Sequence, residues 1–214
     1  MKPNSTYIAV VLDRSGSMGS VKQATIDGFN EFVNQQKLVP GETRLMLTQF
    51  DDVYEVVFDR PIGEVQPLDD KSYEPRGLTA LHDAIGKTVN DVGKSLSAIP
   101  ESERPARVLV AIITDGGENA SKEFDQKQVA DMVKHQQEGY AWAFVFIGAN
   151  QDAVLTAKTF NIPAAAALSY SGKVGSTRGV IGQSLASYAG SVCDPLRGTS
   201  DWAFTKQDRE EAMQ

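Results

Sequence analysis

The chain has 214 residues, enough for one domain that buries about 70% of the surface its unfolded chain would expose. Its 28 acidic and 21 basic residues give a formal net charge of -7, which disfavours binding to nucleic acid or to an anionic membrane. Cys193 is the only cysteine, so an intrachain disulfide and a thiolate metal site are excluded.

The first predicted elements are a buried strand and a helix. Residues 7–12 form an unbroken apolar run, which is typical of a strand that is covered on both faces. Ser20 and Gln23 have the spacing of a capping box, so a helix is expected to begin there, and Pro40 is expected to stop it.

The next predicted elements are a hairpin and a long helix. Residues 44–50 and 53–58 are strand-like and flank Asp51–Asp52, which predicts an antiparallel pair at the edge of the sheet. Residues 61–77 are expected to be loop. Apolar residues recur with a helical period over residues 81–99, which predicts a helix that ends at the following proline.

The second half of the chain continues this alternation. Residues 108–114 form another buried strand, and Asp125 with Gln128 has the form of a second capping box, for a helix that Gly139 ends. The remaining predicted elements are a strand at 142–147, a short helix at 152–160, a strand at 164–170, and a helical stripe formed by Val180, Ile181, Ser184, Leu185 and Tyr188.

Strands that alternate with helices predict a three-layer α/β fold: a doubly wound, mostly parallel six-stranded sheet with one antiparallel edge strand and helices on both faces. We expect residues 1–192 to form this domain. Residues 193–214 are expected to be a tail that is loosely ordered or held to the domain by Trp202 and Phe204. The polar N-terminus lacks the features of a secretion signal and the apolar runs are too short to span a bilayer, which predicts a cytoplasmic protein.

Five oxygen-bearing side chains are predicted to lie at one end of this sheet. Asp13, Ser15 and Ser17 occupy alternate positions directly after the first strand. Thr79 precedes the long helix, and Asp115 directly follows a later strand. Ligands of such sheets bind at the carboxyl ends of the strands. Because carboxylate and hydroxyl oxygens suit a hard divalent cation, the pattern predicts a metal site.

These five residues together resemble the metal-ion-dependent adhesion site (MIDAS) of the von Willebrand factor type A (vWA) domain. The order and spacing of the motifs match over roughly residues 5–170, and they look most like stand-alone type A proteins of bacteria and their phages. The resemblance implies a Rossmann-like fold and a bound Mg²⁺, Mn²⁺ or Ca²⁺, whose open coordination position a partner protein fills with an Asp or Glu side chain. Some relatives work beside AAA+ ATPases or in larger complexes, so either is a candidate partner.

The chemistry of the donor set supports this interpretation. Two carboxylates roughly balance the charge of a divalent cation, and the hydroxyls leave it electrophilic enough to accept one more anionic oxygen. Each residue alone could instead be structural: Ser15 and Ser17 in a turn, Thr79 as a helix N-cap, and Asp115 in a glycine-rich turn. Three loops that converge by the geometry of the fold favour metal binding.

Two alternatives remain open: a Mg²⁺-dependent phosphoryl-transfer enzyme, and a structural assembly subunit whose metal only stabilises the fold. Against an enzyme, Ser15 stands where a haloacid-dehalogenase-like phosphatase has its second Asp, and no P-loop or nucleophile elbow is present. A non-catalytic module is therefore expected. The weaker candidates are Asp51 and Asp52 as turn residues, Asp83 as a first-turn acid, Glu118 and Asn119 at the rim of the site, Arg14 as a steering charge or surface ion pair, and His82 as a structural residue.

Overall fold

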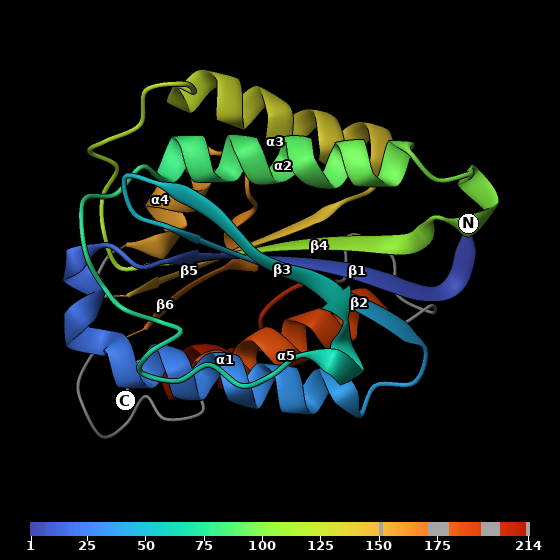
Figure 1. Ribbon diagram of the computed structural model, residues 1–214, viewed down its shortest axis with the longest axis horizontal. Coiled ribbons are helices and arrows are strands. Elements are labelled where there is room, and N and C mark those ends of the chain that lie inside the picture. The colour runs from blue at the N-terminus through green and yellow to red at the C-terminus, as the bar shows by residue number, and fades with distance from the viewer. Residues whose placement is uncertain (150–151, 171–179, 194–201, 213–214) are drawn as a thin grey trace.

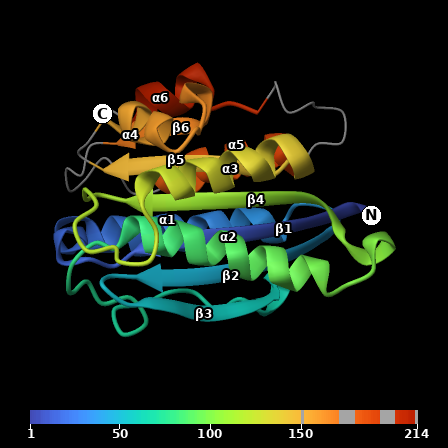
Figure 2. The same cartoon turned by 90° about the horizontal axis from the view of Figure 1, so that it is seen from above.

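A six-stranded sheet forms the centre of the molecule. The computed structural model describes residues 1–149, 152–170, 180–193 and 202–212. The strand order is β3-β2-β1-β4-β5-β6, from one edge of the sheet to the other (Figure 2). β3 is antiparallel to β2 and all other neighbours are parallel, so the predicted fold class is confirmed. The strands are β1 Lys2–Asp13, β2 Glu42–Phe50, β3 Tyr54–Pro61, β4 Pro105–Thr114, β5 Ala143–Ala149 and β6 Ala167–Tyr170.

Helices cover both faces of this sheet. Figure 1 shows α2 and α3 over one face and α1 and α5 over the opposite face. The central strands are covered on both faces and are apolar there, and β5 is buried along its whole length, whereas the edge strand β3 is partly exposed. The helices are α1 Lys22–Lys37, α2 Leu81–Ser97, α3 Gln126–Tyr140, α4 Ala153–Thr159, α5 Val180–Cys193 and α6 Lys206–Ala212.

Two predicted helix boundaries are wrong. Ser20 and Gln23 do not form a capping box, because a 3₁₀ helix at Gly16–Val21 leads directly into α1 and leaves no free helix start to cap. Ser20 Oγ donates instead to the carbonyl oxygen of Ser17. α3 continues past Gly139, and Ala141 adopts the left-handed conformation at its end (φ 53°). The capping box of Asp125 and Gln128 is present.

The segments near the end of the chain pack against β6. Of the predicted strand 164–170, the first three residues form a 3₁₀ turn, and only Ala167–Tyr170 pair with β5. Phe204 is buried, and its amide donates to the carbonyl oxygen of Ala165. Arg209 Nη1 donates to the carbonyl oxygen of Ala167 at 2.9 Å. A domain boundary at residue 192 stays a prediction, and the side chains of Val180, Ile181 and Cys193 lie outside the described part of the chain.

Strand register brings the polar loops to one edge of the sheet. β1 lies between β2 and β4, with Asp13 opposite Phe50 and Leu12 opposite Ile113. Asp13 is therefore beside the end of β4, where Thr114 is the last strand residue. Within the described residues, no helix is long and apolar enough to span a membrane.

Candidate metal centre

The carboxylate of Asp13 is the buried base of the candidate site. Its Oδ1 accepts a hydrogen bond from the amide of Ser15 at 2.6 Å, and its Oδ2 accepts one from Thr114 Oγ1 at 2.5 Å. The hydroxyl of Tyr73 donates to the Asp13 carbonyl oxygen at 2.6 Å. Burial nevertheless outweighs these hydrogen bonds and raises the pKa of Asp13 to about 6. The side chain is thus fixed in place while its charge is poorly compensated.

A series of hydrogen bonds connects the β1 loop to the β4 loop. Ser15 Oγ and Ser17 Oγ are 3.1 Å apart, and Ser17 Oγ donates to Asp115 Oδ1 at 2.6 Å. A Cβ on Gly116 would lie 3.2 Å from Thr79 Oγ1 and 3.3 Å from Ser17 Oγ, so both hydroxyls lie against this glycine. The structure therefore brings Asp13, Ser15, Ser17, Thr79 and Asp115 together from three loops.

These residues fit a hard divalent cation. Burial raises the pKa of Asp115 as well as that of Asp13, and no ion pair joins either acid to a basic side chain within the described residues. Ser17 Oγ donates a hydrogen bond to Asp115 Oδ1 and lies 3.1 Å from Ser15 Oγ, and its oxygen keeps lone-pair capacity for a cation. No group of three or more His, Cys, Asp or Glu side chains suited to a metal occurs in the described ranges. Hydroxyl oxygens would therefore have to complete the donor set, and Ser15, Ser17 and Thr79 place three hydroxyls beside the two acids.

Arg14 belongs to a separate ion-pair cluster beside the site. Its Nε lies 3.1 Å from Asp51 Oδ2 and its Nη1 lies 2.8 Å from Glu55 Oε2. The Arg14 side chain is only 8% exposed, so its ion pair with Asp51 is buried, while its pair with the 53% exposed Glu55 reaches the surface.

Asp51 does more than form the hairpin turn that the sequence predicts. Its Oδ2 also accepts a hydrogen bond from Arg76 Nε at 2.9 Å, and its carbonyl oxygen accepts one from the amide of Ala80. Burial opposes ionisation, but the hydrogen bonds from Arg76 and the Val53 amide, together with the charge of Arg14, hold the pKa of Asp51 below its ordinary value. This carboxylate joins the β2–β3 turn to the loop that carries Thr79.

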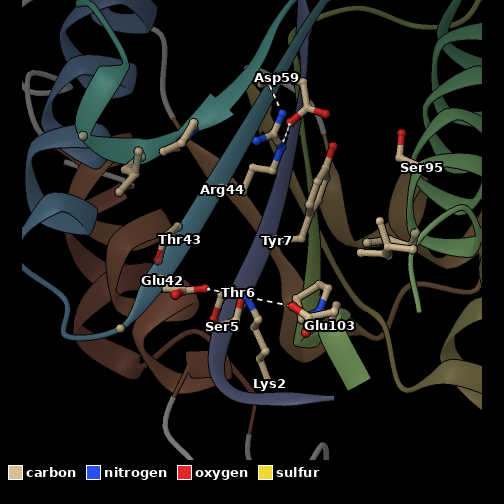
Figure 3. Close-up of a pocket in the computed structure, with 17 residues that line it drawn as sticks. Lys2, Ser5, Thr6, Tyr7, Glu42, Thr43, Arg44, Asp59, Ser95 and Glu103 are labelled. Atoms are coloured by element: carbon tan, nitrogen blue, oxygen red, sulfur yellow. Dashed lines mark hydrogen bonds and ion pairs between the residues drawn. The ribbon is translucent and has the colours of Figure 1, made fainter. Parts of the chain in front are cut away.

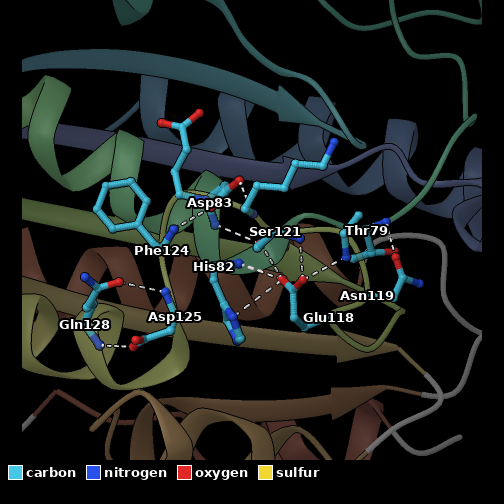
Figure 4. A network of polar contacts seen from close by, with 12 residues as sticks. Thr79, His82, Asp83, Glu118, Asn119, Ser121, Phe124, Asp125 and Gln128 are labelled. Atoms are coloured by element: carbon cyan, nitrogen blue, oxygen red, sulfur yellow. Dashed lines mark hydrogen bonds and ion pairs between the residues drawn. The ribbon is translucent and has the colours of Figure 1, made fainter.

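The N-terminus of α2 is capped by the β4–α3 loop, residues 115–125. Thr79 is not the N-cap; Ala80 takes that position and makes no side-chain cap. The amide of His82 donates to Glu118 Oε2, and the amide of Asp83 donates to Ser121 Oγ (Figure 4). Ser121 has no sequence signal as a cap, because it acts on a helix some 40 residues earlier.

A second polar region lies at the opposite end of the sheet. A cavity of about 730 Å³ opens where β1 and β2 begin, beneath the last turn of α2. Figure 3 shows the ring of Tyr7 in this cavity, with the Arg44–Asp59 ion pair at one end and Lys2 between two acids at the other. Strand β1 separates this cavity from the five residues at its carboxyl end, so it is not part of the candidate metal centre.

Residues 8–162 match the family model of the von Willebrand factor type A domain, and the chain belongs to this family. Domains of this family generally mediate protein–protein interactions, often with a metal ion. The fold is similar to that of a von Willebrand factor type A protein from Catenulispora acidiphila, with 14% identity, a TM-score of 0.57, and coverage of 89% of this chain and 43% of that one. It is equally similar to proximal thread matrix protein 1 from the mussel byssus, with 14% identity, a TM-score of 0.57, and coverage of 89% and 46%.

The chain spans less than half the length of these two structures. No curated protein matches its sequence. At this level of identity the likeness concerns the fold alone.

Proposed function

We propose that this chain is a metal-dependent protein-interaction module with an intact MIDAS. Asp13, Ser15, Ser17, Thr79 and Asp115 hold Mg²⁺, with Mn²⁺ or Ca²⁺ as substitutes, directly or through water. A partner protein supplies an Asp or Glu carboxylate to the remaining coordination position. The observation that carries the proposal is the hydrogen-bonded series from Asp13 to Asp115, in which two poorly compensated carboxylates are interleaved with hydroxyls.

The placement of the site supports recognition of another molecule. Gly16 and Ser17 are exposed, while Asp13 and Thr79 are buried beneath them. A cation held there would present its open side to solvent. The chain carries a net charge of -7, which repels an acidic partner at long range. A bound divalent cation supplies the positive charge that would reverse this repulsion locally.

Mn²⁺ titration followed by electron paramagnetic resonance tests the metal part, because Mn²⁺ that binds to the protein no longer contributes to the signal of the free ion. Wild type should take up one Mn²⁺ per chain, Asp13→Asn should take up none, and Asp131→Asn on the exposed face of α3 should match wild type. Uptake by Asp13→Asn equal to that of wild type would refute the assignment of the ligands.

Peptide binding tests the recognition part. Capped peptides that contain Asp or Glu should bind about tenfold more tightly with Mg²⁺ than with EDTA, and the matched Asn or Gln peptides should show no such difference. Immobilised wild type should retain a partner protein in Mg²⁺, and the Asp13→Asn variant should not retain it. A cytoplasmic AAA+ ATPase or complex subunit of a bacterium or phage is the partner class that we propose.

The proposal describes a binding protein without turnover. Phosphate-ester hydrolysis in Mg²⁺ that is lost in Asp13→Ala would show a phosphoryl-transfer enzyme instead. If Asp13→Ala unfolds the protein and no acidic ligand binds to wild type, the metal would be only a structural element.

A further inference from the structure

The backbone of Thr79 is fixed by the β4–α3 loop. Its amide donates to Asn119 Oδ1 at 2.9 Å, and its carbonyl oxygen accepts hydrogen bonds from the amides of Asn119 at 3.0 Å and Ala120 at 3.2 Å. The next amide, that of Ala80, donates to the carbonyl oxygen of Asp51 at 2.9 Å. Both polar backbone groups of Thr79 are therefore engaged, while its hydroxyl remains against Gly116.

Glu118 fastens the same loop to α2. Its Oε2 accepts hydrogen bonds from the amide of His82 at 2.9 Å and from Ser121 Oγ at 2.7 Å, and its Oε1 accepts them from the amides of Ala120 and Ser121 (Figure 4). Burial opposes ionisation, but the hydrogen bonds from His82 and Ser121 hold the pKa of Glu118 below its ordinary value. The carboxylate thus stays charged at the positive end of the helix dipole.

Asp83 holds the far end of the loop. Its Oδ1 accepts hydrogen bonds from the amides of Glu123 and Phe124, and its Oδ2 accepts one from the amide of Lys122, each at 2.8 to 2.9 Å. The loop and the first turn of α2 consequently cap each other. Glu118 and Ser121 accept hydrogen bonds from amides of the helix, and Asp83 accepts hydrogen bonds from amides of the loop. Asp115 belongs to this loop, and Thr79 directly precedes Ala80, the N-cap of the helix.

We infer that Asn119 is a positioning residue for Thr79, and that Thr79 and Asp115 form one preassembled unit within the metal centre. Asn119 does not contact the cation. Its amide oxygen holds the Thr79 backbone by a hydrogen bond, and the backbone in turn fixes the position of the Thr79 hydroxyl. The inference rests on the proposed function for its metal part. The positioning itself is a property of the metal-free chain and can be measured without a cation.

The test compares Asn119→Ala, which removes the acceptor oxygen, with Asn119→Asp, which keeps it. Asn119 is exposed, so neither change disturbs the core. Gln126→Ala is the matched control, because it removes an exposed amide at the start of α3. Hydrogen exchange of the Thr79 amide is measured by NMR in EDTA, and Mn²⁺ affinity is measured by electron paramagnetic resonance.

In Asn119→Ala, we expect the Thr79 amide to exchange at least about tenfold faster and Mn²⁺ to bind about tenfold more weakly, as is usual when a group that orients a ligand is lost. Asn119→Asp and Gln126→Ala should stay within about threefold of wild type in exchange. Asn119→Asp should bind Mn²⁺ at least as tightly as wild type.

Two results would overturn the inference: unchanged Thr79 exchange in Asn119→Ala, or equal losses in Asn119→Ala and Asn119→Asp, which would indicate general damage to the loop. Failure of wild type to take up Mn²⁺ would refute the proposed function instead. In that case the exchange data alone would decide the positioning role of Asn119.

Discussion

Replacing Asp13 by asparagine should stabilise the metal-free protein and remove its response to divalent cations. Burial raises the pKa of Asp13 to about 6 from an ordinary value of 3.8. At about 1.4 kcal/mol for each pKa unit, ionisation of this carboxyl costs the folded metal-free protein about 3 kcal/mol at neutral pH. Asparagine removes that cost but turns one of the two acceptor oxygens into an NH₂ group, which loses about 1 kcal/mol. The net expectation is a gain of about 2 kcal/mol.

The sign of the pH dependence follows from the same values. Between pH 3.8 and about 6 the folded protein binds more protons than the unfolded chain, so metal-free wild type loses stability as the pH rises through this window. Asp13→Asn lacks this loss. The advantage of the variant should therefore be greatest above about pH 6 and should be lost near pH 4, where the ionisation cost no longer exceeds the loss of the hydrogen bond.

Thermal unfolding in EDTA and in Mg²⁺ provides the assay. For a chain of this length, 1 kcal/mol corresponds to about 2–4 °C in Tm, so Asp13→Asn should melt roughly 4–8 °C above wild type in EDTA. Mg²⁺ at about 100 times its Kd should raise the Tm of wild type by roughly 5–11 °C and should leave the variant unchanged. A variant that is less stable than wild type in EDTA, or that gains equally from Mg²⁺, would refute the reasoning.

Three further predictions concern the rest of the fold. Gly182→Ala in α5 should lower the free energy of unfolding in urea by about 1–3 kcal/mol, since its Cβ would lie 2.6 Å from a backbone oxygen of α1; Gly190→Ala in the same helix meets nothing within 4 Å and should gain about 0.5–1 kcal/mol. Asp83→Asn should cost about 2 kcal/mol at pH 7. Amide hydrogen bonds outweigh burial and lower the pKa of Asp83. Its contribution to the free energy of unfolding is therefore present above the ordinary pKa and is lost as the pH falls through the pKa of the folded state. In the variant, stability should fall less steeply at acidic pH. Phe204→Ala should cost about 3 kcal/mol in calorimetry, because the ring is 5% exposed and packs against α5.

Hydrophobic pattern was sufficient to predict the sheet and the placement of the loops that carry Asp13 and Asp115. Residues 7–12 and 108–114 read as buried strands because both faces of β1 and β4 are covered, and strands of that kind leave continuous apolar runs. Asp13 and Asp115 could then be placed at one edge from the topology alone. The capping box at Asp125 was also predictable, because donor and acceptor are three residues apart.

Contacts that span long stretches of sequence left no such signal. Arg14, Asp51 and Arg76 form one ion-pair cluster, yet they lie in three loops with no common period. Glu118 and Ser121 cap a helix that begins before them in the chain, whereas capping patterns describe only local partners. The local signature at Ser20 was misleading because the 3₁₀ helix Gly16–Val21, which contains Ser17, replaces a capped helix start.

The hydrogen bond from Ser17 to Asp115 joins residues 98 positions apart, and it exists because β1 and β4 are neighbours. On the ribosome, the first half of the chain therefore lacks Asp115 of the proposed cation site until β4 has been synthesised and has docked. Closure of so long a loop is slow, because its entropy cost must be met before the contacts between β1 and β4 stabilise the chain. If the proposed cation site is correct, ion binding would follow the docking of β4 against β1 rather than guide it.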